Sequence, residues 1–148
     1  MATTSDRTQT GFSEAERAAM KERAEELRAS GRGGKKKASD AEAMLTKIAE
    51  MPDGERVLAE RLLAIVTEAA PDLLPKTWYG MPAWAEADGK IVCFFQGASK
   101  FEARYSTFGF NDPANLDDGT VWPTSFAVTD LTDADVAFFT ELVRRAVA

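Results

Sequence analysis

Large aromatic side chains and basic residues occur together in the second half of the chain. Aromatic residues beside a few convergent polar groups are what a small-molecule or peptide pocket requires. Tryptophan favours a pocket further, because a buried indole N–H needs a hydrogen-bond partner. The alternative is that most of these side chains form the core, since cores and pocket linings use the same residue types. The predicted site lies on a concave sheet face and consists of Tyr79, Met81, Trp84, Lys100, Arg104 and Trp122.

The composition offers few residues that could act in nucleophilic catalysis. The chain contains no histidine, which excludes Ser-His-Asp and Cys-His pairs and imidazole-bound zinc or iron. The single cysteine, Cys93, allows no intrachain disulfide and no CxxC site, and its apolar neighbours predict an inert, buried thiol. We therefore predict no catalytic residue. One alternative stays open, an enzyme of unknown chemistry that uses carboxylates with Lys100 or Arg104.

Oxygen-bearing side chains gather in a segment where turn residues are dense. Asp112, Asp117 and Asp118, with Asn111 and Asn115, offer the kind of ligand that a hard cation prefers. Their spacing does not match a calcium-binding loop, because no glutamate closes it. Asp-Asp-Gly is also ordinary turn chemistry. We therefore treat the three aspartates as weak metal candidates.

Length and composition describe one soluble globular domain. The chain has 148 residues, of which 45% are hydrophobic and 28% charged, and a formal net charge of −6. Residues 1–40 hold nine basic and seven acidic side chains, which leaves a net charge of −8 for the remainder. An acidic body repels phosphate backbones, so we predict no nucleic-acid binding by the core domain. The lack of a long apolar stretch predicts no membrane association and a cytoplasmic location.

An N-terminal extension precedes the folded domain. The capping-box sequence Ser13–Glu16 predicts a helix over residues 14–29. Its apolar residues are mainly alanine, so we expect a loosely attached helix. Three glycines and four basic residues in Gly31–Lys37 are typical of a linker. We therefore divide the chain into an extension, residues 1–38, and a domain, residues 39–148.

Three further helices are expected in the domain. Ser39–Glu42 is a second capping box and predicts a short helix. Asp53 is placed to cap a longer helix over residues 54–70, and Thr132–Asp135 caps a terminal helix. Apolar residues at helical spacing predict the buried faces: Leu58, Leu62, Ile65 and Ala69 in the longer helix, and Val136, Phe139 and Val143 in the terminal one.

A change of period predicts a sheet after Pro71. Asp88-Gly89 is a strong hairpin turn, a further turn is expected at Gly80-Met81-Pro82, and residues 109–123 are expected to be irregular. The predicted strands cover residues 77–79, 83–86, 90–96, 101–108 and 124–128. Together these elements predict an α+β fold, with a curved antiparallel sheet of about five strands, helices on one face and an N-terminal helical extension.

Three segments resemble a known family. They are the run Pro75–Trp84, the hairpin into Val92–Phe95, and the Lys100-Phe101 step into the next predicted strand. They resemble the YdhG-like proteins of the YjbR/CyaY superfamily, a domain of unknown function often labelled iron chaperone by analogy with frataxins. The resemblance covers residues 39–148 and implies an α+β fold with helices on one face of an antiparallel sheet. The family label implies a protein that donates iron to a client.

Iron binding of the frataxin type relies on a ridge of exposed carboxylates, and the candidates here are sparse. Glu22, Glu25 and Glu26 alternate with basic residues, and pairs such as Lys21 with Glu25 ordinarily solvate a helix surface. Iron held by carboxylates alone is bound weakly and with little selectivity. Iron therefore enters as a cofactor through the resemblance alone, and we expect these glutamates to face solvent.

Three classes of function fit these observations. The leading hypothesis is a small non-enzymatic monomer that binds a small molecule or a protein client on its aromatic sheet face. An enzyme of unknown chemistry is the second. The third is an interaction module whose basic linker and alanine-rich helix engage an acidic partner.

Overall fold

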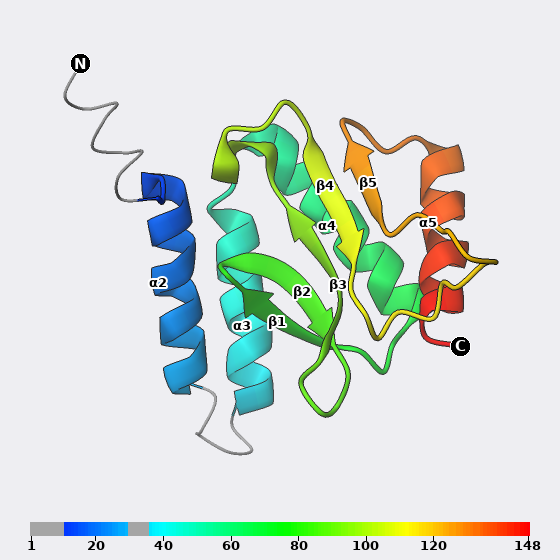
Figure 1. Ribbon diagram of the computed structural model, residues 1–148, viewed down its shortest axis with the longest axis horizontal. Coiled ribbons are helices and arrows are strands. Elements are labelled where there is room, and N and C mark those ends of the chain that lie inside the picture. Colours follow the sequence, from blue (N-terminus) through cyan, green and yellow to red (C-terminus); the bar gives the residue numbers. More distant parts are fainter. Residues whose placement is uncertain (1–10, 30–35) are drawn as a thin grey trace.

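A five-stranded antiparallel sheet forms the centre of the computed structural model, which describes residues 11–29 and 36–148 (Figure 1). The strands are β1 (Leu74–Trp78), β2 (Met81–Ala85), β3 (Ile91–Gln96), β4 (Ser106–Phe110) and β5 (Ser125–Val128), and each pairs with its neighbour in sequence. The helices described are α2 (Glu14–Ala29), α3 (Lys36–Ala49), α4 (Asp53–Ala69) and α5 (Asp133–Ala146), with a short 3₁₀ helix, η2 (Ala98–Phe101). The predicted α+β class with an N-terminal helical extension is confirmed.

Two capping boxes form as predicted. The amide of Ser13 donates to the carboxylate of Glu16 (2.9 Å), and the amide of Glu16 donates back to the Ser13 hydroxyl (3.1 Å). Thr132 and Asp135 make the same reciprocal pair at the start of α5. These contacts satisfy amides that the first turn of a helix leaves free, so α2 and α5 begin where the sequence predicts.

Two other predicted helix caps are wrong. Ser39 does not cap α3, because the helix already begins at Lys36, and lysine and alanine both favour continuing a helix. Asp53 is the first residue of α4 and makes no capping bond, since Pro52 occupies the cap position. The carboxylate of Asp53 pairs instead with Arg56 (3.1 Å) within the first turn. The predicted linker, Gly31–Lys37, lies largely outside the described residues.

The turn between β1 and β2 lies one residue earlier than predicted. Trp78 pairs with Met81, which leaves Tyr79 and Gly80 as a two-residue loop. Both have positive φ, 52° and 77°, as a type I′ turn requires. Glycine adopts this conformation without strain, whereas tyrosine does so at a cost. The predicted hairpin at Asp88-Gly89 is confirmed, with Gly89 at φ 91°.

The predicted strand over residues 101–108 is wrong in its first half. Residues Ala98–Phe101 form η2, which ends at Glu102 in the left-handed conformation (φ 56°). The Ser106 hydroxyl accepts a hydrogen bond from the Ala98 amide (3.0 Å) and closes this loop. Alternation of polar and apolar residues therefore occurs here in an exposed loop, and the strand itself begins at Ser106.

The core lies between the sheet and helices α3, α4 and α5. Cross-strand pairs place Trp84 opposite Cys93 and Phe95 opposite Phe108, and all four are buried on the helix-covered face. The predicted stripe of α4 faces them, with three residues buried and Ala69 half-buried. In α5 two predicted core residues are buried and Val136 is half-buried against them.

Aromatic rings also line the opposite face of the sheet. Trp78 and Phe94 meet edge to face, with ring centroids 5.1 Å apart. Phe94 lies across Gly109 on the neighbouring strand, where a Cβ atom would overlap its ring. The missing side chain at residue 109 therefore makes room for Phe94.

Candidate functional site

The predicted site residues separate into two groups. Trp84 is 1% exposed and belongs to the core, Trp122 is half-buried against the core, and Arg104 is exposed with its guanidinium over the ring of Tyr105 (5.4 Å). The backbone amide of Tyr79 and the side chain of Lys100 both contact glutamates of α2, and Met81 lines a cavity beside Lys100. Of the predicted residues, those at and around the β1–β2 turn therefore form a polar site.

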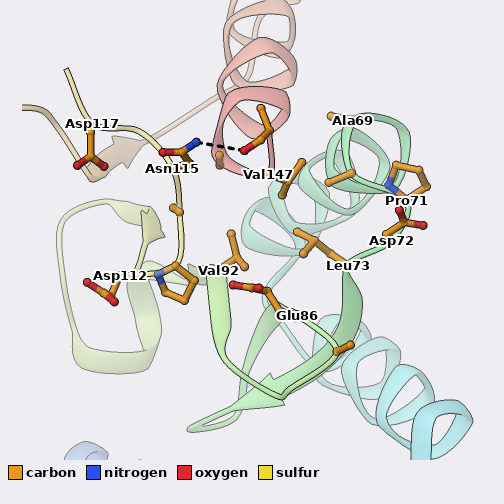
Figure 2. A pocket seen from close by; sticks show the side chains of 16 residues that line it. Ala69, Pro71, Asp72, Leu73, Glu86, Val92, Asp112, Asn115, Asp117 and Val147 are labelled. Carbon is orange, nitrogen blue, oxygen red and sulfur yellow. Dashed lines mark hydrogen bonds between the residues drawn. The ribbon is translucent and has the colours of Figure 1, made fainter.

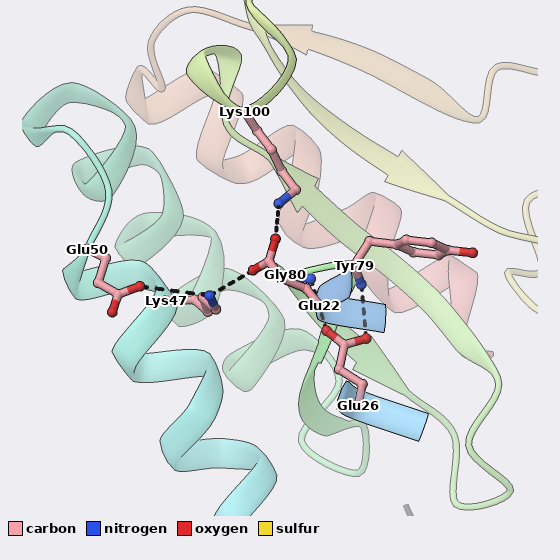
Figure 3. Close-up of polar contacts among 7 residues, drawn as sticks. All are labelled: Glu22, Glu26, Lys47, Glu50, Tyr79, Gly80 and Lys100. Carbon is pink, nitrogen blue, oxygen red and sulfur yellow. Dashed lines mark hydrogen bonds and ion pairs between the residues drawn. The ribbon is translucent and has the colours of Figure 1, made fainter. Parts of the chain in front are cut away.

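Two consecutive backbone amides define this site. The N–H groups of Tyr79 and Gly80 donate to the two carboxylate oxygens of Glu26, at 3.0 and 2.9 Å (Figure 3). Successive N–H groups in a turn form a concavity that binds anions. The chain therefore builds an anion site at the turn and occupies it with a carboxylate of its own helix α2.

Two lysines complete the site beside the turn. Glu22, one helical turn before Glu26, accepts from Lys47 of α3 (2.7 Å) through one oxygen and from Lys100 of η2 (2.9 Å) through the other. Its carboxylate also lies against Gly80, where a Cβ atom would overlap it. One glutamate thus joins α2 to a second helix, to the 3₁₀ helix and to the hairpin.

The charges of this cluster reinforce one another. Partial burial by itself raises the pKa of Glu22, but the hydrogen bonds and charges of Lys47 and Lys100 outweigh it and hold that pKa below its ordinary value. The hydrogen bond to Glu22 likewise raises the pKa of Lys47, against the opposing effect of burial. Glu50 adds a weaker contact with Lys47 at 3.9 Å. At neutral pH Glu22 and Lys47 are therefore both charged.

We call the two turn amides and the two lysines the carboxylate seat, meaning the N–H groups of Tyr79 and Gly80 with the side chains of Lys47 and Lys100. Within α2, Ala19 is the buried residue, so little apolar area holds the helix. Arg23 adds a contact over the Tyr79 ring (5.7 Å) and an ion pair with Glu26 (3.4 Å).

The expectation that these glutamates face solvent is therefore wrong for two of the three. Glu22 and Glu26 bind the carboxylate seat, whereas Glu25 is exposed as predicted. A signal was present in the sequence. Like charges at i and i+4 destabilise an isolated helix, so Glu22 and Glu26 on one face indicate donors on another element.

Two cavities flank α2 where it lies on the seat. One of about 290 Å³ lies between α2, α3 and β1, and Lys76 and Thr77 form part of its wall. The other, of about 210 Å³, lies between α2, the α3–α4 junction and η2. Both are lined by Glu22 and Lys47. The alanine-rich helix therefore occupies the seat without filling the space on either side.

A third carboxylate uses the same chemistry nearby. Glu55 of α4 accepts from the amide of Ser99 (3.3 Å) and from its hydroxyl (3.0 Å). It lies over Gly97, where a Cβ atom would overlap it. Glutamates from two helices thus hold two turns at the same end of the sheet.

A third cavity, of about 740 Å³, lies near the carboxyl ends of α4 and α5 (Figure 2). Its wall includes the exposed carboxylates of Asp72, Glu86, Asp112 and Asp117 around an apolar floor that contains Val92. Asn115 attaches the surrounding loop to the end of α5. Its backbone amide donates to the carbonyl of Ala146, and its side-chain amide donates to the carbonyl of Ala148.

Metal-ligating side chains do not gather in the described part of the chain. No group of three or more aspartates, glutamates or cysteines there is placed to hold a metal ion. The weak metal candidates Asp112, Asp117 and Asp118 therefore rest on sequence alone. Cys93 is buried as predicted, and burial raises the pKa of its thiol well above the usual range.

Comparison with known proteins identifies no relative. No protein family, curated protein or solved structure matches this chain significantly. Within residues 11–29 and 36–148, no helix is long and apolar enough to cross a membrane.

Proposed function

We propose that this protein is a non-enzymatic binding domain whose carboxylate seat recognises a carboxylate-bearing ligand. The observation that carries the proposal is the way the chain's own glutamates are held. Glu26 is bound by two consecutive amides, and Glu22 by two lysines within 2.9 Å. Charge-assisted hydrogen bonds of this kind are roughly twice as strong as neutral ones, which makes the site selective for anions.

Because of the net charge of the chain, a carboxylate ligand is attracted only at short range. With a net charge of −6, the protein repels acidic ligands at a distance. A carboxylate must therefore reach the seat itself before it gains the contacts with Lys47, Lys100 and the turn amides. Such an arrangement distinguishes a well-placed carboxylate from anionic surfaces in general.

The protonation state of the lysine at the seat supports binding over catalysis. A lysine that acts as a nucleophile or base has a lowered pKa, which leaves its amine neutral. The pKa of Lys47 is raised, so it stays an ammonium group and acts as a donor.

The test uses a variant in which α2 no longer satisfies the seat. In Glu22→Lys/Glu26→Lys, one new ammonium group faces Lys47 and Lys100 and the other faces the turn amides, so donors meet donors and α2 should leave. Glutarate is then titrated into the ¹⁵N-labelled variant, with the neutral diol 1,5-pentanediol as the matched control. We expect saturable shifts of the Tyr79 and Gly80 amide signals with glutarate only. If neither signal moves in the folded variant, the proposal is wrong.

We also propose, as a second candidate, that the chain is a YdhG-like domain of the YjbR/CyaY superfamily that supplies iron to a client. Its support is the α+β fold, with a five-stranded antiparallel sheet and helices on one face, which is what the resemblance implies. Anaerobic calorimetric titration with ferrous iron tests the iron role. Saturable binding at micromolar metal would favour it, and no saturable binding at that concentration would remove it.

A further inference from the structure

Helix α2 behaves as a ligand that is part of the same chain. Its attachment rests on Glu22 and Glu26, which meet the seat, while Ala19 is its buried apolar residue. Met20 and Leu27 remain 39% and 55% exposed. An element attached mainly through two carboxylates is replaceable by another element that presents the same two groups.

The spacing of the two carboxylates specifies what such a replacement looks like. Glu22 and Glu26 are four residues apart on one helix face, so one carboxylate reaches the lysines while the other reaches the turn amides. Isolated carboxylates lack this fixed separation, whereas any helix with two acidic residues at i and i+4 provides it. The seat is therefore suited to a helix that carries two acidic residues at this spacing.

The space around α2 favours a bulkier occupant. The cavities of about 290 and 210 Å³ border the helix on both sides of Glu22, and Ala29 lines the larger one. A helix with leucine or methionine in place of Ala29 would extend into the larger cavity and bury more apolar area than α2 does.

We infer that the carboxylate seat is a docking surface for an acidic helix of a partner protein and that α2 is its in-chain competitor. The inference rests on the proposed function, since it names the kind of carboxylate ligand. Tethering gives α2 an effective concentration on the order of millimolar, so a partner helix must bind more tightly than α2 to displace it. Its larger side chains supply the additional contacts.

The experiment measures binding of a fluorescein-labelled peptide with the sequence of residues 13–31 by fluorescence anisotropy. The full-length Glu22→Lys/Glu26→Lys protein presents an open seat. Wild type is closed, and Glu60→Lys/Glu68→Lys is the control, since it makes the same charge change at exposed positions of α4. We expect saturable binding to the open protein and at least about tenfold weaker binding to the two closed proteins.

Substitutions in the peptide and in the seat lysines test the contact further. A peptide carrying Glu22→Gln/Glu26→Gln should lose binding, as should the open protein with Lys47→Ala/Lys100→Ala added. A peptide carrying Ala29→Leu should bind more tightly than the parent peptide. If the open variant fails to give a folded amide spectrum, the Glu22→Gln/Glu26→Gln protein takes its place.

Three results would overturn the inference. If glutarate shifts the Tyr79 and Gly80 amides but the peptide does not bind, the seat accepts carboxylates and not a helix, and the proposed function stands. If neither ligand binds the open protein, both proposals fail. Concentration-dependent dimers of the wild type in light scattering, lost in the open variant, would make a second copy of this chain the occupant.

Discussion

Gly80 is the residue on which the hairpin and the docked helix both depend. Its φ of 77° belongs to the region that side chains disfavour, and the Glu22 carboxylate lies where its Cβ would be. We predict that Gly80→Ala destabilises the protein by about 1–2 kcal/mol from backbone strain alone, and that it displaces Glu22. Urea denaturation measures the first effect, and the line width and shift of the Tyr79 amide report the second.

Gly54 in α4 is the matched control for this substitution. A Cβ there meets no atom, so Gly54→Ala should be neutral or stabilising by up to about 1 kcal/mol. Equal stability of the Gly80→Ala and Gly54→Ala proteins would contradict the requirement for glycine at the turn.

The buried indole N–H of Trp84 makes the cost of substitutions at this residue predictable. Its indole N–H is buried without a hydrogen-bond partner among the described residues, and such a donor costs about 1–3 kcal/mol. Phenylalanine removes the donor and keeps most of the ring, so Trp84→Phe should cost less than about 1.5 kcal/mol, whereas Trp84→Ala should cost about 3–5 kcal/mol. Thermal denaturation of the two variants compares them, and a loss as large in Trp84→Phe as in Trp84→Ala would disprove the argument.

At the scale of elements, α2 joins the body through ionised groups, so its docking depends on pH. The pKa of Glu22 lies below its ordinary value of 4.5, so its contribution is present above that pH and is lost as acid protonates the carboxylate. The pKa of Lys47 lies above its ordinary value of 10.5, so its contribution is complete below that pH and is lost at higher pH. Docking should therefore be strongest between these two limits.

This behaviour predicts the stability of Glu22→Gln across pH. The variant should be less stable than wild type at pH 7, by up to about 1 kcal/mol, because the cluster is only partly buried and solvent still screens its charges. The difference should vanish as the pH falls below the folded pKa of Glu22. Denaturant unfolding at a series of pH values measures it, with Glu60→Gln at an exposed position of α4 as control. A gap that persists at pH 2 would show that the charge of Glu22 is not its source.

Elements whose contacts are local were predictable from the sequence. The caps at Ser13 and Thr132 involve residues three apart, so a short pattern contains the whole interaction. Ser39 shows the limit, because the same pattern lies inside a helix that good helix formers extend upstream. The alternation over residues 101–108 misled for a related reason, since exposed loop residues alternate by chance without a partner strand.

The seat was not predictable in the same way. Lys100 and Glu22 are 78 residues apart, and Glu26 and Gly80 are 54 apart, so the contacts exist only after the chain folds. The sequence singled out Tyr79, Met81 and Lys100 for aromatic or cationic character. The spacing of Glu22 and Glu26 indicated donors on another element, but it did not identify those donors as Lys47, Lys100 and the turn amides.

The whole molecule combines an acidic surface with one compact set of donors at an end of the sheet. The other end holds the larger cavity, whose wall carries four carboxylates. The separation of these two features explains how a chain with net charge −6 holds carboxylates at one place. It also makes α2 the element whose position decides whether the donors are available.

Hydrogen exchange of the Tyr79 and Gly80 amides is the most direct test of the proposal that α2 is a replaceable occupant of the carboxylate seat. In the wild type both amides should be protected, because Glu26 accepts from each of them. In Glu22→Lys/Glu26→Lys both should exchange rapidly, and the peptide with the sequence of residues 13–31 should restore their protection. Equal protection in wild type and variant would contradict the proposal that α2 occupies the seat, and no restoration by the peptide would contradict the proposal that another helix can replace it.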